Sequence, residues 1–100
     1  MKTPKDILAT EFSEEFVARM KNRMCVSYFK YGKVADNASV YDCVQNVRGR
    51  LANHELDGNT EWLIDAANFA MIEYMHPQHS NAHFRATDSS EAPKLAERRE

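Results

Sequence analysis

Apolar residues recur every three or four positions along three long stretches of this chain, the spacing that places side chains on one face of a helix. In the first stretch Phe16 and Met20 begin such a series. Ser13, which two acidic residues follow, has the features of a helix start, and Gly32 has those of a helix end. The pattern predicts a first long helix over residues 13–31.

A second helix is predicted over residues 39–55. Ser39 and Asp42 have the spacing of a capping box, in which two side chains satisfy the first backbone N–H groups of a helix. The apolar positions that follow keep a period of about 3.6 residues. Residues 33–38 are predicted to be a connection.

The third stretch, residues 61–75, is the most apolar. A turn signal precedes it at 57–59, and it ends before Pro77 because the residue before a proline is disfavoured in a helix. Glu61, Asp65 and Asn68 share a narrow arc, and almost every other position is apolar. Since a surface helix usually has a broader polar face, this helix is predicted to be central and enclosed by the others.

The two ends of the chain differ in character. Thr3 followed by Pro4 marks a short N-terminal helix, which is expected to dock on the core through an apolar edge at 7–8. From Pro77 onward apolar residues become sparse and charges are balanced, which predicts a polar, partly disordered tail over 77–100. Within this tail Phe84 is a candidate contact with the body.

Together these elements predict an all-α fold. We expect a small antiparallel bundle of three main helices plus a short N-terminal helix in a domain over 1–76, followed by an extended C-terminal tail over 77–100. The helices are expected to be antiparallel neighbours because their connections are short. Three helices of this length bury limited area, so the apolar third helix also suggests association, for example as a homodimer.

Composition narrows the class of protein. Of the 100 residues, 43% are apolar and 28% are charged, which is ordinary for a globular domain. The net charge of -2 gives no general attraction for nucleic acid. No apolar run approaches the ~18 residues of a membrane span, and the N-terminus lacks the apolar segment of a signal peptide. These features predict a soluble protein with no membrane partner.

Two cysteines, Cys25 and Cys43, are too few for a disulfide scaffold. Both fall within apolar helical patterns, where a free cysteine behaves as a small buried apolar residue. A reduced, cytosolic setting fits this cysteine content best.

Glu61 and Asp65 are candidate metal ligands. They lie one turn apart on one helix face and offer convergent oxygens to Mg²⁺, which takes one or two carboxylates plus substrate phosphates. Asn68 would orient a ligand or a water molecule. The alternative is structural: these residues form the solvent stripe of a buried helix, or Asp65 and Asn68 make hydrogen bonds to the other helices.

Arg19, Arg23 and Lys30 form a basic stripe on the first long helix. Such a stripe is suited to binding phosphate groups. The alternative is a solvated face on which Glu15 and Arg19 make an ordinary exposed pair.

Two segments, residues 20–32 and 57–77, resemble a group of small, mostly uncharacterised phage and prophage proteins, over roughly residues 12–90. More remotely, residues 61–68 are similar to the second metal-binding helix of MazG-like all-α nucleoside triphosphate pyrophosphohydrolases. That family hydrolyses nucleotides to monophosphates and pyrophosphate with Mg²⁺ held by clustered carboxylates. The family spacing is Glu-x-x-Asp, whereas Glu61 and Asp65 are four positions apart, and Ala18 interrupts the first motif.

The resemblances imply two functions. The first is a non-catalytic phage-type accessory protein that binds a host or defence protein in the cytoplasm of a bacterial cell. The incomplete carboxylate set favours this one. The alternative is a divergent MazG-like, Mg²⁺-dependent pyrophosphohydrolase, with Glu61 and Asp65 as metal ligands, Asn68 in support and Lys30 as a phosphate contact.

Overall fold

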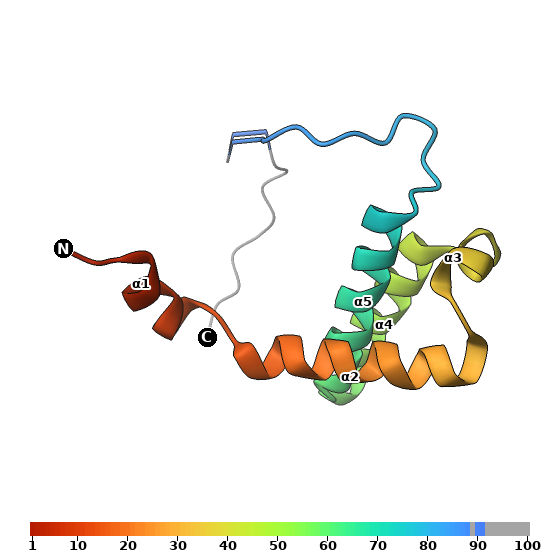
Figure 1. The fold of residues 1–100 in the computed structure, drawn as a ribbon, viewed down its shortest axis with the longest axis horizontal. Coiled ribbons are helices and arrows are strands. Elements are labelled where there is room, and N and C mark those ends of the chain that lie inside the picture. The colour runs from red at the N-terminus through yellow and green to blue at the C-terminus, as the bar shows by residue number, and fades with distance from the viewer. Residues whose placement is uncertain (89, 92–100) are drawn as a thin grey trace.

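The computed structural model describes residues 1–88 and 90–91, and this part of the chain contains helices and no strands (Figure 1). The predicted all-α fold is therefore confirmed. In chain order the elements are α1 (Pro4–Glu11), α2 (Glu14–Tyr31), α3 (Val34–Asn37), the short 3-10 helix η1 (Ala38–Val40), α4 (Cys43–Asp57) and α5 (Glu61–Met75).

Helices α4 and α5 form an antiparallel pair, and α2 lies across this pair (Figure 1). The arrangement differs from a bundle in which all three long helices run side by side. The reason is the connection between α2 and α4, which spans residues 32–42 and contains α3 and η1. The short turn between α4 and α5 forces these helices to be antiparallel neighbours, whereas the longer connection between α2 and α4 places no such constraint on α2.

The core is centred on α5. Four apolar side chains are buried, Cys43 at the start of α4 and Ile64, Ala66 and Ile72 on α5. Asn68, also on α5, is the one buried polar residue in the described part of the chain. The prediction that the third long helix is central and enclosed is therefore confirmed for residues 62–69, which are all buried or half-buried, whereas Tyr74 and Met75 at its end are exposed.

The first two helices begin where their capping residues predict. Thr3 Oγ1 accepts a hydrogen bond from the Asp6 backbone N–H at 3.2 Å, and Asp6 Oδ2 accepts one from the Thr3 N–H at 3.0 Å. Ser13 Oγ accepts a hydrogen bond from the backbone N–H of Phe16 at 2.9 Å, which starts α2. These bonds satisfy N–H groups that have no partner within the helix.

The predicted start of the second helix at Ser39 is wrong. Tyr41 has an extended backbone (φ -99°, ψ 133°), so the chain is interrupted between η1 and α4. Asp42 itself caps α4, because its Oδ1 accepts a hydrogen bond from the Gln45 N–H at 3.1 Å. Part of the predicted connection is instead helical and forms α3.

The turn between α4 and α5 is built around Asp57. Its Oδ1 accepts a hydrogen bond from the Asn59 backbone N–H at 2.8 Å, and its Oδ2 accepts one from Trp62 Nε1 at 3.1 Å. Gly58 has φ +73°, in the left-handed region that favours glycine. The hydrogen bonds from Asn59 and Trp62 hold the pKa of the Asp57 carboxyl below its ordinary value.

Three expected contacts with the core are absent. Helix α1 does not dock: each of its residues is exposed, and it projects away from the α4–α5 pair (Figure 1). Phe84 is 83% exposed, so it is not the point at which the tail meets the body. Cys25 is exposed as well, because α2 is covered on one side only.

Gln78 makes the contact that Phe84 does not. Its side-chain Nε2 donates hydrogen bonds to the backbone oxygens of Ala38 at 2.9 Å and Tyr41 at 2.6 Å. Residues 76–88 contain no helix, in keeping with the predicted extended tail. For residue 89 and residues 92–100 the tail prediction lies outside the described residues.

Replacing Ile72 by alanine is expected to lower the free energy of unfolding by about 2–4 kcal/mol, because it leaves a cavity in a small core. Leu56→Ala is the matched control: Leu56 is 87% exposed and its removal should change the free energy by less than about 0.5 kcal/mol. Urea unfolding followed by circular dichroism measures both. Equal effects of the two substitutions would contradict this core.

The Asp57 carboxylate makes stability depend on pH in acid. The pKa of Asp57 is lower in the folded than in the unfolded chain. The carboxylate therefore contributes to the free energy of unfolding above the unfolded-state pKa, and this contribution is lost as the pH falls through the folded-state pKa, below about pH 4. In Asp57→Asn the melting temperature should therefore fall less steeply than in the original chain as the pH is lowered below about 4. Asp6→Asn is the control, since the pKa of Asp6 is also lowered but α1 does not contact the core. An equally steep fall of the melting temperature in Asp57→Asn and in the original chain would contradict this role of Asp57.

Candidate functional site

Two carboxylates of α5 and one guanidinium of α2 meet where the helices cross. Arg23 Nη1 lies 3.4 Å from Glu61 Oε1, and Arg23 Nε lies 3.4 Å from Asp65 Oδ1. Glu61 and Asp65 are one turn apart, so they present both carboxylates to the same partner. The side chain of Asp65 is 15% exposed and that of Glu61 is 53% exposed. The structure thus brings together residues that the sequence assigned to separate metal and phosphate sites.

This arrangement bears on the magnesium prediction. The positive charge of Arg23 stands beside both candidate ligands and opposes a second cation there. Within the described residues no group of three or more histidine, cysteine, aspartate or glutamate side chains is placed to hold a metal ion. The assignment of Glu61 and Asp65 as metal ligands stays a prediction, and the geometry favours an ion-pair cluster that holds α2 to α5.

Asn68 also joins these two helices. Its Nδ2 donates a hydrogen bond to the backbone oxygen of Met20 on α2 at 3.1 Å. The residue is 5% exposed, and its Oδ1 is buried without a hydrogen-bond partner among the described residues. The structural alternative for Asn68, a hydrogen bond to another helix, is therefore confirmed.

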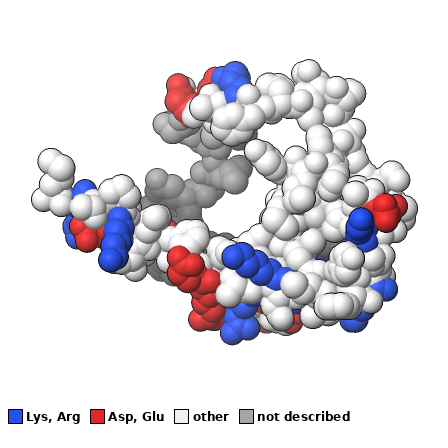
Figure 2. All heavy atoms as spheres, in the orientation of Figure 1, with Lys and Arg blue, Asp and Glu red and all other residues white. Residues whose placement is uncertain are grey.

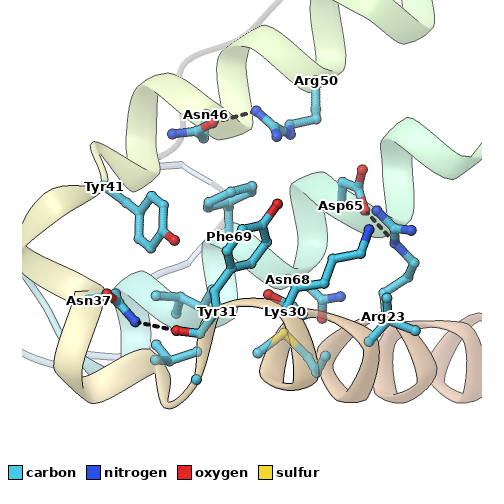
Figure 3. Close-up of a pocket in the computed structure, with 16 residues that line it drawn as sticks. Arg23, Lys30, Tyr31, Asn37, Tyr41, Asn46, Arg50, Asp65, Asn68 and Phe69 are labelled. Atoms are coloured by element: carbon cyan, nitrogen blue, oxygen red, sulfur yellow. Dashed lines mark hydrogen bonds and ion pairs between the residues drawn. The ribbon is translucent and has the colours of Figure 1, made fainter.

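A cleft of about 450 Å³ opens beside this cluster, between α2, α3 and the α4–α5 pair (Figure 3). Asp65 and Asn68 lie on its α5 wall. Three cationic side chains and three aromatic rings also line it: Arg23, Lys30, Arg50, Tyr31, Tyr41 and Phe69. The volume is in the range of about 300–1,000 Å³ that small-molecule sites have.

Arg50 and Phe69 form the wall opposite α2. The Arg50 guanidinium carbon lies 4.5 Å from the centroid of the Phe69 ring, a cation–π geometry, and its Nη1 donates a short hydrogen bond to Asn46 Oδ1. The Arg50 Nε is buried and has no hydrogen-bond partner. The Tyr41 ring meets Phe69 edge to face, with centroids 6.3 Å apart. This wall is held in place by its own contacts.

Sequence reasoning missed this wall. Asn46 and Arg50 are four positions apart on α4, a spacing that places both side chains on one face of the helix. Tyr41 and Phe69 carried no signal, because an aromatic residue in an apolar pattern ordinarily indicates core.

The predicted basic stripe is divided. Lys30 and Arg23 border the cleft, but Arg19 forms an exposed pair with Glu15, with 3.1 Å between Arg19 Nε and Glu15 Oε1. The solvated-face alternative is confirmed for this pair. Arg19 lines a second hollow of about 690 Å³ between α2 and the start of α5. Figure 2 shows acidic and basic side chains interspersed along α1 and α2, with no broad basic area in this view.

The thiol of Cys43 is not a candidate nucleophile. Cys43 is 1% exposed, and its burial raises the pKa of the thiol, with smaller contributions from the negative charges of Glu73 and Asp42. A buried thiol with a raised pKa stays protonated and unreactive near neutral pH. Its role is packing at the start of α4.

Comparisons of this chain with protein-family models, with curated proteins and with solved structures return no match. The resemblances to phage proteins and to MazG-like enzymes therefore stay predictions. None of the helices in the described part of the chain combines the length and the hydrophobicity needed to cross a bilayer. Any functional conclusion depends on the geometry of the cluster, the cleft and the exposed faces.

A double-mutant cycle on Arg23→Gln and Asp65→Asn is expected to give a coupling energy of about 1 kcal/mol, because Asp65 is largely buried and the pair is partly shielded from water. The matched cycle on Arg19→Gln and Glu15→Gln should give about 0.3 kcal/mol or less, since both side chains are exposed. Urea unfolding measures all variants. A coupling for Arg23 and Asp65 no larger than that for the exposed pair would contradict a structural role for the cluster.

Proposed function

We propose that this chain is a non-catalytic accessory protein that binds another protein through exposed apolar side chains of its helices. The observation that supports this most directly is the balance of apolar surface. In the described residues four apolar side chains are buried, whereas fifteen large hydrophobic residues are exposed, among them Phe29 at 86% and Tyr74 at 77%. Single exposed apolar residues are normal, but a domain this small needs most of its apolar area in the core.

Helix α1 is the part best placed to bind. Ile7 and Leu8 are 47% and 54% exposed, and Phe12, directly after the helix, is 48% exposed. An isolated helix of eight residues is marginal in water, so α1 gains little stability unless its apolar edge meets a second surface. An amphipathic helix that enters an apolar groove of a partner is a common mode of recognition.

The phage-type resemblance supports a host or defence protein as this partner and the cytoplasm of a bacterial cell as the location. A second copy of the chain would satisfy the same apolar faces, so homodimerisation belongs to the same proposal. In Figure 2 the face over α5 and the segment that follows it carries few charged side chains, which is compatible with a protein interface.

The alternative function is the divergent MazG-like pyrophosphohydrolase. What favours it is that Asp65, Asn68, Arg23 and Lys30 border one cleft. What weighs against it is that Arg23 already pairs with both carboxylates. Pyrophosphate release from a nucleoside triphosphate with Mg²⁺ or Mn²⁺, abolished by Asp65→Asn, would replace the proposed function with the enzymatic one.

Leu8→Glu is expected to weaken partner binding about tenfold or more, because it places a charge in the buried part of the interface. Ala9→Glu is the matched control: it adds the same charge to the same helix, about 100° around the axis. The tagged protein is purified from a bacterial lysate, and each co-purifying protein, a second copy included, is identified and its affinity measured with the pure components.

Both variants should keep the unfolding midpoint of the original chain, since α1 does not contact the core. A specific partner lost in Leu8→Glu and kept in Ala9→Glu supports the proposal. Equal retention in both variants, or a chain that binds nothing and remains monomeric, contradicts it.

A further inference from the structure

We infer that the cleft between α2, α3 and the α4–α5 pair binds a small organic anion that carries a planar ring. The inference is independent of the proposed function, because no residue of α1 lines this cleft. It depends on two features of the cleft walls, their charge and their rings (Figure 3).

The charge of the cleft favours an anion. Arg23 pairs with two carboxylates, Glu61 and Asp65, so this cluster carries one net negative charge. Lys30 and Arg50 form no ion pair with any described residue, and their two positive charges exceed that negative charge. Lys30 reaches the cleft from α2 and Arg50 from α4, so the two free positive charges approach it from different helices (Figure 3). A carboxylate or phosphate placed between them gains charge-assisted hydrogen bonds from both sides.

The rings favour a planar ligand. The Arg50 guanidinium lies over one face of the Phe69 ring, and the Tyr41 and Phe69 rings meet in an edge-type pair, so the position of Phe69 on the cleft wall is fixed by its neighbours. Tyr31 lies on the other side of the cleft, at the end of α2, and is 64% exposed. A ring inserted here packs against aromatic side chains, which gains more than burial alone when the rings meet at an offset or at an edge.

The test uses para-hydroxybenzoate as the probe, titrated into the full isotope-labelled chain and followed by amide NMR spectra. The buffer contains a chelator, so that no metal ion bridges ligand and protein. Binding is expected with a Kd in the low millimolar range or below, as suits about ten non-hydrogen atoms, with the largest shifts around Lys30, Arg50 and Asn68. Acetate, which lacks the ring, and para-cresol, which lacks the charge, should each bind at least about fivefold more weakly.

Lys30→Gln should weaken para-hydroxybenzoate binding by about three- to tenfold, because it removes one unpaired charge from the cleft. Lys21→Gln is the matched control, since Lys21 is an exposed residue of the same helix that does not line the cleft. Both positions are exposed, so both variants should fold, which their amide spectra will show. No saturable shift, equal binding of acetate or para-cresol, or equal affinities of the two variants would each overturn the inference.

Discussion

The enclosure of α5 is the constraint on which the rest of the structure depends. Three of the four buried apolar residues in the described chain lie on this helix, with α4 packed along it and α2 across it. Because α5 is covered from two directions, two of its polar side chains have their partners on α2. Asp65 pairs with Arg23, and Asn68 donates to the Met20 backbone, so the polar arc of α5 attaches α2 to the helical pair.

The same crossing geometry produces the cleft. A helix that crosses an antiparallel pair leaves space beside the crossing, and here α3 borders that space together with α2, α4 and α5. The side chains that border this space are mixed in chemistry: Lys30 and Arg50 make no ion pair with any described residue, and Arg50 also stacks on Phe69. The core is small, and it leaves α1 and many apolar side chains outside it. The proposed anion site and the proposed protein-binding faces therefore both depend on this one packing arrangement.

Local signals in the sequence predicted local structure well. The capping residues Thr3 and Ser13 placed two helix starts, and the apolar circumference of residues 61–75 placed the central helix. The predictions that depended on contacts distant in sequence were less secure. The capping box at Ser39 was wrong because Tyr41 is extended, and the docking of α1 was wrong because an apolar edge does not specify what will cover it. Pairing Arg23 with Asp65 required the crossing of α2, which no spacing along the chain encodes.

Amide hydrogen exchange distinguishes a central α5 from an undocked α1. Exchange from the core helix requires opening of the fold, whereas exchange from a helix without tertiary contacts requires only local fraying. We expect the amides of residues 64–72 to exchange most slowly of all and those of α1 to exchange with almost no protection. Protection of α1 comparable to that of α5 in the isolated protein, or fast exchange throughout α5, would contradict it.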